Sequence, residues 1–217
     1  MSLAIFDLDE TLIDGNSPSL WSAYLGELGW LDTASFVPAE QALVARYSQG
    51  LASIEDYLEH TLEPLIGRTP AEVEYVAAGF VEERIEPLIF SQAMQRVAEH
   101  RARGERILII SATPTFLVRV IAERLGIDQA LGTDLEVAHG IYTGKMAGIG
   151  CAREGKISKL NQWLAEQELS LADAHFYSDS HNDLPLLNHV TTAHAVNPDP
   201  VLRRHAEQHG WEILHWQ

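Results

Sequence analysis

Short apolar runs that end abruptly at polar residues recur along this 217-residue chain. The runs are LAIF, RILII, HFY, TTAHAV and WEILHW, at 3–6, 106–110, 175–177, 191–196 and 211–216. Amphipathic helical patterns separate several of them, such as those at 115–126 and 156–167. Runs this short and this apolar are typical of strands that are buried on both faces. Their alternation with helices predicts an α/β fold with a Rossmann-like, mostly parallel sheet.

Two segments depart from this alternation. Residues 135–146 contain two short runs around His139-Gly140, which predicts a hairpin outside the main sheet. Residues 17–90 carry helical periodicity without a clear strand pattern, and Pro38, Pro64, Pro70 and Pro87 punctuate them. We therefore expect an α/β core made of 1–16 and 91–217, with 17–90 inserted as a helical cap.

Polar residues follow three of the predicted strands at the point where each strand ends. The three sets are Asp7-Leu8-Asp9-Glu10-Thr11, Ser111-Ala112-Thr113-Pro114 and Ser178-Asp179-Ser180-His181-Asn182-Asp183. Lys156 begins a predicted helix between the second and third sets. Ligands of an open parallel sheet bind outside the carboxyl ends of its strands, so we expect these residues to form one site.

Each set suits the binding of a phosphate group. Carboxylates from two strand ends are suitable ligands for Mg²⁺, which also offsets the repulsion between Asp7 and Asp9. Thr113-Pro114 is typical of a helix cap followed by proline at the first helical position, and free N–H groups at such a helix start attract anions. Lys156 adds a positive charge for a phosphoryl oxygen. A carboxylate within this site would be able to attack phosphorus and form an acyl-phosphate.

Each motif also has an ordinary structural explanation. An Asp-x-Asp pair occurs in turns because Asp bonds the nearby backbone, and Ser111 or Lys156 alone would be a cap or a solvated lysine. The prediction of catalysis therefore depends on the coincidence of all the sets in one order along the chain.

Taken together, DLDET, a strand ending in Ser111, Lys156 and SDSHNDLPLL resemble the haloacid dehalogenase superfamily of phosphohydrolases. The helical insertion between the first and second motifs is similar to subfamily IB, the phosphoserine-phosphatase-like branch with a C1-type cap. The resemblance covers nearly the whole chain. It implies a Mg²⁺-dependent phosphatase that works through an aspartyl-phosphate.

The resemblance also implies a role for each motif residue. Asp7 would be the nucleophile, and Asp9 would protonate the leaving alkoxide and then activate water. Mg²⁺ would be bound by the Asp7 carboxylate, the Asp9 backbone carbonyl and Asp179. The remaining roles are phosphate binding by Ser111, Lys156 and Asn182, and support of the site by Thr11 and Asp183.

Two departures from the branch bear on the substrate. Phosphoserine phosphatases carry a Glu nine positions after the nucleophile that recognises the amino group, whereas this chain has Asn16 there. Their second motif continues as Ser-Gly-Gly, whereas this chain reads Ser111-Ala112-Thr113. The closing stretch AVNPDPVLRRHAEQHGWEIL looks more like a neighbouring group that includes enzymes proposed to act on histidinol phosphate. Histidinol phosphate is therefore the candidate substrate, ahead of phosphoserine.

Aromatic residues of the helical insertion are expected to form mostly its own core, with one or two in contact with the leaving group. They are Trp21, Tyr24, Trp30, Tyr47 and Tyr57.

Two other functions remain open at this level. A phosphotransferase or mutase would use the same aspartyl-phosphate and pass the phosphoryl group to an acceptor other than water. A receiver-like signalling module would be phosphorylated on Asp7. Asp9 argues against the signalling module, because a long-lived phospho-aspartate needs no neighbouring acid.

Charge and cysteine content limit the partners and the compartment. The formal net charge of −16 repels nucleic acid and anionic headgroups, so we expect neither nucleic acid nor membrane as a partner. A single cysteine, Cys151, fits a reducing compartment, and Asp7 interrupts the first apolar run too early for a secretory signal. We expect a cytoplasmic enzyme that acts on a small phosphate ester. The sequence predicts no oligomeric state.

Overall fold

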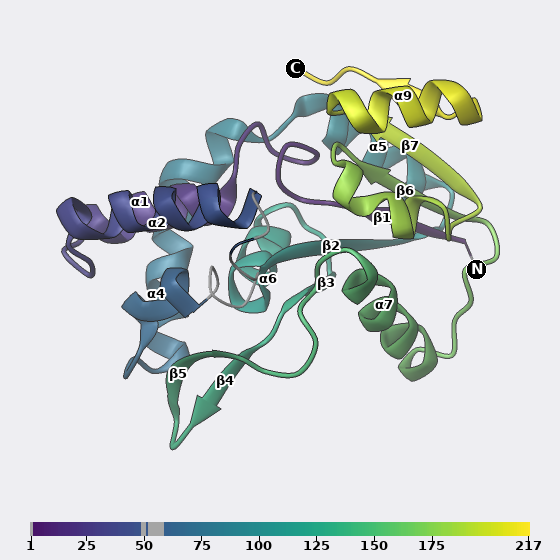
Figure 1. Cartoon of the computed structure of the whole chain (residues 1–217). Coiled ribbons are helices and arrows are strands. Elements are labelled where there is room, and N and C mark those ends of the chain that lie inside the picture. Colours follow the sequence, from purple (N-terminus) through teal and green to yellow (C-terminus); the bar gives the residue numbers. More distant parts are fainter. Residues whose placement is uncertain (1, 49–50, 52–58) are drawn as a thin grey trace.

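The computed structural model describes residues 2–48, 51 and 59–217, and its centre is a six-stranded parallel sheet (Figure 1). The strand order is β3-β2-β1-β6-β7-β8, and each neighbouring pair is parallel. The strands are β1 (Leu3–Phe6), β2 (Arg106–Pro114), β3 (Gln129–Thr133), β6 (Ala174–Ser178), β7 (Thr192–Val196) and β8 (Glu212–Leu214). The predicted α/β fold and all five predicted strands are confirmed. The sequence analysis missed β3, whose QALGT sequence lacks an apolar run.

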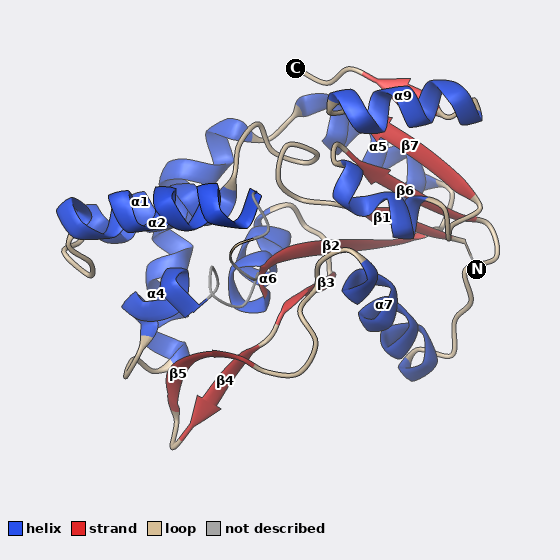
Figure 2. Ribbon diagram, in the orientation of Figure 1, coloured by secondary structure: helices blue, strands red, loops and turns tan. Residues whose placement is uncertain are grey.

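Helices cover both faces of this sheet (Figure 2). They are α5 (Ser91–Ala102), α6 (Thr115–Arg124), α7 (Glu154–Glu166), α8 (Leu184–Leu187) and α9 (Pro200–His209). Side chains of β1 alternate between two buried clusters, with Ala4 and Phe6 in one and Leu3 and Ile5 in the other. Burial on both faces explains why the strand is apolar at every position.

Residues 17–90 contain helices and no strand within their described part. They form α1 (Ser17–Glu27), α2 (Thr33–Ser48), η1 (Glu63–Leu65), α4 (Pro70–Phe80), a π-helical turn η2 (Val81–Ile85) and η3 (Glu86–Leu88). Figure 1 shows α1, α2 and α4 together, beyond the end of β2. The predicted helical character of this segment is confirmed for these ranges. None of the helices in the described ranges has the length and apolar character needed to cross a bilayer.

Aromatic contacts join this segment to the sheet-bearing part. Trp21 and Tyr24 are buried, and the ring of Trp21 lies 5.2 Å from that of Phe80 and 5.9 Å from that of Phe116 in α6. Trp30 is half-buried beneath the guanidinium of Arg68. The predictions for the side chains of Tyr47 and Tyr57 lie outside the described residues.

The predicted hairpin is confirmed as β4 (Leu135–Ala138) and β5 (Ile141–Met146), an antiparallel pair outside the main sheet. His139 and Gly140 both have positive φ, at 54° and 82°, as a tight two-residue hairpin turn requires. Tyr142 exchanges backbone hydrogen bonds with 67–68, donating to the carbonyl of Arg68 (2.9 Å) and accepting from Gly67 (3.0 Å). The hairpin is thereby joined to the helical segment.

The end of β2 corrects one prediction. Thr113 and Pro114 belong to the strand, and α6 begins at Thr115, so Thr113 is not a helix cap. The pairing of β2 with β3 shifts register between Ile110 and Pro114, which lengthens the strand past Ser111. Gly132 of β3 makes this possible: a Cβ there would lie 2.6 Å from the carbonyl oxygen of Thr113.

Histidine and tyrosine rings lie between the sheet and α5. The ring of Tyr177 stacks between those of Phe6 (4.5 Å) and His194 (4.1 Å). His194 is buried, and its Nδ1 lies 2.7 Å from Glu212 Oε2, so Nδ1 donates to the carboxylate. Its Nε2 then accepts from His175 Nδ1 at 3.0 Å. Burial lowers the pKa of His194 to about 4, and the nearby Glu212 opposes this shift.

Protonation of His194 should therefore oppose folding in mild acid. Between the usual histidine pKa of 6.5 and about 4, the unfolded chain binds a proton at residue 194 that the folded protein does not bind. The contribution of His194 to the free energy of unfolding should fall over this range by on the order of 2 kcal/mol. Urea unfolding followed by tryptophan fluorescence at several pH values would measure it. On acidification, His194→Gln should lose less stability, or gain more, than His189→Gln, an exposed control; equal slopes of unfolding free energy against pH would contradict the assignment.

Candidate active site

The parallel register of β1 and β6 brings the first and third polar sets together. Phe6 pairs with Tyr177, and the N–H of Asp7 donates to the carbonyl of Tyr177 at 2.9 Å. Asp7 therefore emerges beside Ser178 and Asp179, which end β6 and follow it. Because β2 lies on the other side of β1, Ser111 and Thr113 reach the same edge of the sheet.

A buried ammonium group connects two carboxylates at this edge. Lys156 Nζ donates to Asp7 Oδ1 at 2.9 Å and to Asp183 Oδ2 at 2.7 Å. Ser178 Oγ also donates to Asp183 Oδ2, at 2.7 Å. The four side chains are nearly inaccessible to solvent. Three of these residues were predicted, and the structure brings them into direct contact; Ser178 lay within the third motif but was given no role.

Burial and charge set the pKa values of this group. Burial raises the pKa of Asp7 well above its usual value; Lys156 opposes the shift, and Asp183 and Asp179 add to it. Burial acts to lower the pKa of Lys156, but the carboxylates of Asp183 and Asp7 outweigh burial and raise it. The ammonium is thus held charged, while burial remains the main cause of the raised pKa of Asp7.

Asp179 is fixed by Thr11 across the same edge. Thr11 Oγ1 donates to Asp179 Oδ1 at 3.3 Å and accepts from the N–H of Asp179 at 3.1 Å. Burial raises the pKa of Asp179 to about 7, and the negative charge of Asp183 adds to the effect. Thr11 therefore holds Asp179 in place, and the predicted support of the loop after the first strand by Thr11 stays a prediction.

The donors at this edge fit a hard divalent cation. In the described part of the chain, no three side chains of His, Cys, Asp or Glu are grouped to hold a metal. The available donors are two carboxylates, Asp7 and Asp179, together with the carbonyl of Asp9. Mg²⁺ is commonly held in this way, by one or two carboxylates and otherwise by water and phosphate oxygens. Burial is the main cause of the raised pKa of both carboxylates, and a bound cation would favour their ionised forms.

Asp9 has surroundings different from those of Asp7. Its Oδ1 accepts from the N–H of Ser17 at 2.5 Å, and its Oδ2 accepts from Thr113 Oγ1 at 2.9 Å. Burial raises the pKa of Asp9, while the hydrogen bonds from Ser17 and Thr113 oppose the shift. No motif in the sequence pointed to Ser17, and Thr113 was predicted to be a helix cap.

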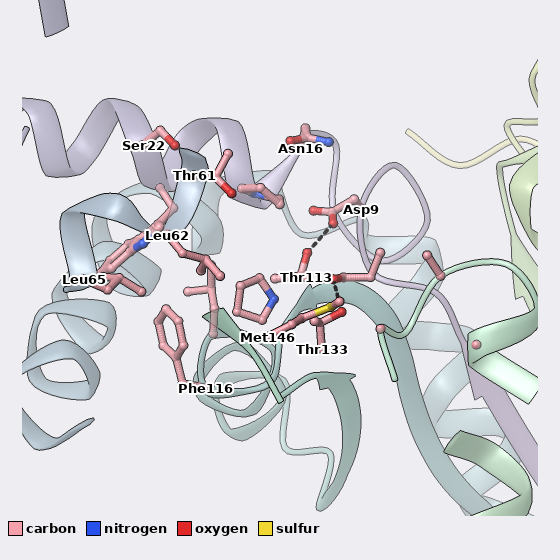
Figure 3. Close-up of a pocket in the computed structure, with 18 of the residues that line it drawn as sticks. Asp9, Asn16, Ser22, Thr61, Leu62, Leu65, Thr113, Phe116, Thr133 and Met146 are labelled. Carbon is pink, nitrogen blue, oxygen red and sulfur yellow. Dashed lines mark hydrogen bonds between the residues drawn. The ribbon is translucent and has the colours of Figure 1, made fainter. Parts of the chain in front are cut away.

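A cavity of about 400 Å³ opens beside Asp9 (Figure 3). Trp21, Leu62 and Leu65 from the helical segment and Phe116 and Leu117 from α6 give it an apolar wall. Its polar lining includes Asn16, Ser22, Thr61, Thr113 and Thr133. Asp9 is the one charged side chain among the described residues that line it. Asn16 also caps α1, because its side chain accepts from the N–H of Ser19 at 3.0 Å.

Within the described ranges, the structure gives two predicted phosphate ligands, Ser111 and Asn182, no hydrogen bond to Asp7, Lys156 or Asp183. Ser111 is buried at the register shift of β2, and its Oγ accepts from the N–H of Thr113 at 3.2 Å. Asn182 is exposed in the short turn η4 (His181–Asp183), and its N–H donates to Ser180 Oγ at 3.2 Å. Their phosphate-binding roles stay predictions.

Comparison with known proteins gives consistent relatives. The family model of haloacid dehalogenase-like hydrolases matches residues 4–188. The chain is 38% identical to a histidinol-phosphatase of Neisseria meningitidis, covering 100% of this chain and 99% of the relative. It is 32% identical to a phosphoserine phosphatase of Mycobacterium tuberculosis, covering 97% of this chain and 69% of that protein.

Solved structures agree. A protein of unknown function from Bordetella pertussis superposes with a TM-score of 0.93 at 37% identity, covering 98% of this chain and 97% of the other. A substrate-bound phosphoserine phosphatase shares the fold, with a TM-score of 0.68 at 20% identity over 98% of this chain and 91% of the other. The resemblance read from the motifs is confirmed: the chain belongs to the haloacid dehalogenase-like hydrolase family and is a phosphatase of its phosphoserine-phosphatase-like branch.

Proposed function

We propose that the protein is a Mg²⁺-dependent phosphomonoesterase that acts on a small phosphorylated metabolite through an aspartyl-phosphate on Asp7. The proposal depends on one observation: Asp7 and Asp9, only two positions apart, have different hydrogen-bond partners. Asp7 is held by the Lys156 ammonium, whereas Asp9 is held by neutral donors beside the cavity. Carboxylates in such different surroundings suit different chemical roles.

In the proposed reaction, a carboxylate oxygen of Asp7 attacks phosphorus and the bond to the ester oxygen breaks. Asp9 gives its proton to that oxygen, and the alcohol leaves. Asp9 then takes a proton from water as the water oxygen attacks phosphorus, which releases inorganic phosphate and restores the Asp7 carboxylate. Ser111 and Lys156 hold the transferring phosphoryl oxygens, with Asn182 at the rim, while Asp183 orients Lys156 through its hydrogen bond.

Mg²⁺ is the proposed cofactor, and phosphatases of this family generally use it. Asp7, Asp179 and the Asp9 carbonyl would hold the ion. When bound, it supplies positive charge for the phosphoryl group and for the carboxylates around it.

We propose that 17–90 serve as a cap over a core made of 1–16 and 91–217. The cavity supports this division, because its walls come from both parts: Trp21, Leu62 and Leu65 from the cap and Thr113 and Phe116 from the core. A leaving group in this cavity would be shielded from water while its ester oxygen lies near Asp9.

The cavity favours histidinol phosphate over phosphoserine. Phosphoserine carries a carboxylate, and the described lining has no lysine or arginine to pair with it. Histidinol phosphate has an amino group and an imidazole but no carboxylate, and the cavity combines an apolar wall with several neutral polar side chains. The relative in Neisseria meningitidis with matching length carries the name of that activity. We further propose a cytoplasmic enzyme without nucleic-acid or membrane partners, in keeping with its net charge of −16.

A phosphate-release assay would test the proposed substrate. With Mg²⁺, kcat/KM for histidinol phosphate should exceed that for phosphoserine by about 100-fold or more, because an unpaired carboxylate would have to be desolvated in the cavity. Removal of the metal with EDTA should abolish release, and added Mg²⁺ should restore it. Adding acceptor alcohols tests the alternative phosphotransferase function; dominant transfer products at modest alcohol concentration would overturn the hydrolase assignment. Equal slow rates on every ester would contradict the substrate.

Substitution of the two carboxylates would test the intermediate. Asp7→Asn should lose turnover, because the attacking oxygen is gone, and should carry no covalent phosphate. Asp9→Asn should abolish turnover or accumulate phosphate on Asp7, which mass spectrometry after an acid quench would detect. Asp128→Asn, at an exposed site outside the cavity, is the matched control. Turnover like that of the wild type in Asp7→Asn would overturn the mechanism.

The buried ammonium should also stabilise the fold. Lys156→Met leaves Asp7 and Asp183 buried without their cation, so unfolding free energy at neutral pH should fall by roughly 3–5 kcal/mol. Lys159→Met makes the same change in the same helix but removes a pair with the half-exposed Asp134, and should cost less than about 1 kcal/mol. Equal losses in urea unfolding of the metal-free proteins would contradict this difference.

A further inference from the structure

Donors from two separate parts of the chain hold the two oxygens of Asp9. The N–H of Ser17, the first residue of α1, donates to Oδ1, and the hydroxyl of Thr113, near the end of β2, donates to Oδ2. Ser17 Oγ and Thr113 Oγ1 lie 3.3 Å apart. Both residues are buried, with 0% and 2% of their surface exposed. Figure 3 shows Thr113 directed at Asp9 beside the cavity.

When Asp9 is ionised, the hydroxyls of both Thr113 and Ser17 are able to donate to its carboxylate. A carboxylate accepts and does not donate, so the Thr113 proton lies towards Asp9 Oδ2. Ser17 Oγ lies 3.3 Å from Thr113 Oγ1 and also interacts with the Asp9 carboxylate. The Ser17 side chain thus lies against both Thr113 and Asp9, while the Ser17 backbone N–H holds Oδ1 of Asp9.

Thr113 also connects Asp9 to a predicted phosphate ligand. Its N–H donates to Ser111 Oγ at 3.2 Å, while its side chain donates to Asp9. The backbone at this point is fixed by close approach to Gly132, where a Cβ would lie 2.6 Å from the Thr113 carbonyl oxygen. One residue therefore sets the distance between the predicted phosphate-binding hydroxyl and the predicted proton donor.

We propose that Thr113, with Ser17 beside it, is a positioning residue that aims Asp9 at the leaving-group oxygen during cleavage of the ester. This inference rests on the proposed acid role of Asp9. Since Ser17 begins the first helix of 17–90, the same hydrogen bonds make the orientation of Asp9 depend on where α1 lies. Proton delivery and the placing of α1 beside the leaving group are thereby linked.

Leaving-group dependence tests this role. The probes are aryl phosphates from p-nitrophenyl to phenyl phosphate together with the alkyl ester histidinol phosphate, and the measure is kcat/KM, which reports steps up to phosphorylation of Asp7. A good leaving group departs without an acid, whereas a poor one needs the proton. Thr113→Val should lower kcat/KM by about 10–100-fold for the poorest leaving groups and by less than about threefold for p-nitrophenyl phosphate.

Two further variants make the test specific. Thr113→Ser keeps the hydroxyl, so its kcat/KM should vary with the leaving group much as that of the wild type does. Thr133→Val removes a hydroxyl from the same cavity that bonds the Ala112 carbonyl rather than Asp9, so any loss should be equal across the series. Equal losses across the series in Thr113→Val would overturn the positioning role. Absence of hydrolysis of every ester by the wild type would instead overturn the proposed function.

Discussion

The buried ammonium of Lys156 is the interaction on which the arrangement of the site depends. It joins two carboxylates that are far apart in the sequence. Asp7 directly follows β1, and Asp183 lies in the turn after β6. Burying a cation is unfavourable unless paired oxygens compensate it, so α7, which carries Lys156, is held against the carboxyl ends of β1 and β6. The parallel register makes this pairing possible, because it delivers both carboxylates to one edge of the sheet.

One lysine does not neutralise the carboxylates gathered there. Asp7, Asp9 and Asp179 all have raised pKa values, with burial as the main cause in each. Replacing one of these carboxylates would remove the cost of burying it. The same change would also remove oxygens that are suited to bind a hard cation or to act as a nucleophile. The protein instead keeps several buried carboxyl groups where the proposed divalent ion and phosphate ester would meet. Asp9 is held separately by neutral donors, which add no charge to the edge.

Much of this arrangement is readable from sequence, because strand ends and polar motifs coincide. The apolar runs predicted five of the six strands, and the parallel sheet follows from the helices between them. β3 was missed since QALGT is held by pairing with β2 rather than by an apolar pattern of its own. Thr113 was misassigned because Thr-Pro before an apolar helix is a common cap pattern, whereas here the register shift against Gly132 keeps it in the strand. Its bond to Asp9 spans 104 residues, and no local pattern predicts a contact of that kind.

In the proposed reaction, different parts of the chain would bind the two ends of the ester. The charged end would lie among groups at the carboxyl ends of β1, β2 and β6, whose positions the sheet fixes. The organic end would lie against Trp21, Leu62 and Phe116, whose positions depend on how α1, η1 and α6 pack together. Asp9 stands at the boundary between these regions, because it follows β1 yet accepts from the first amide of α1. A change of leaving-group preference through the helical segment would therefore also act on the orientation of Asp9, so the proposed mechanism couples selectivity to proton transfer.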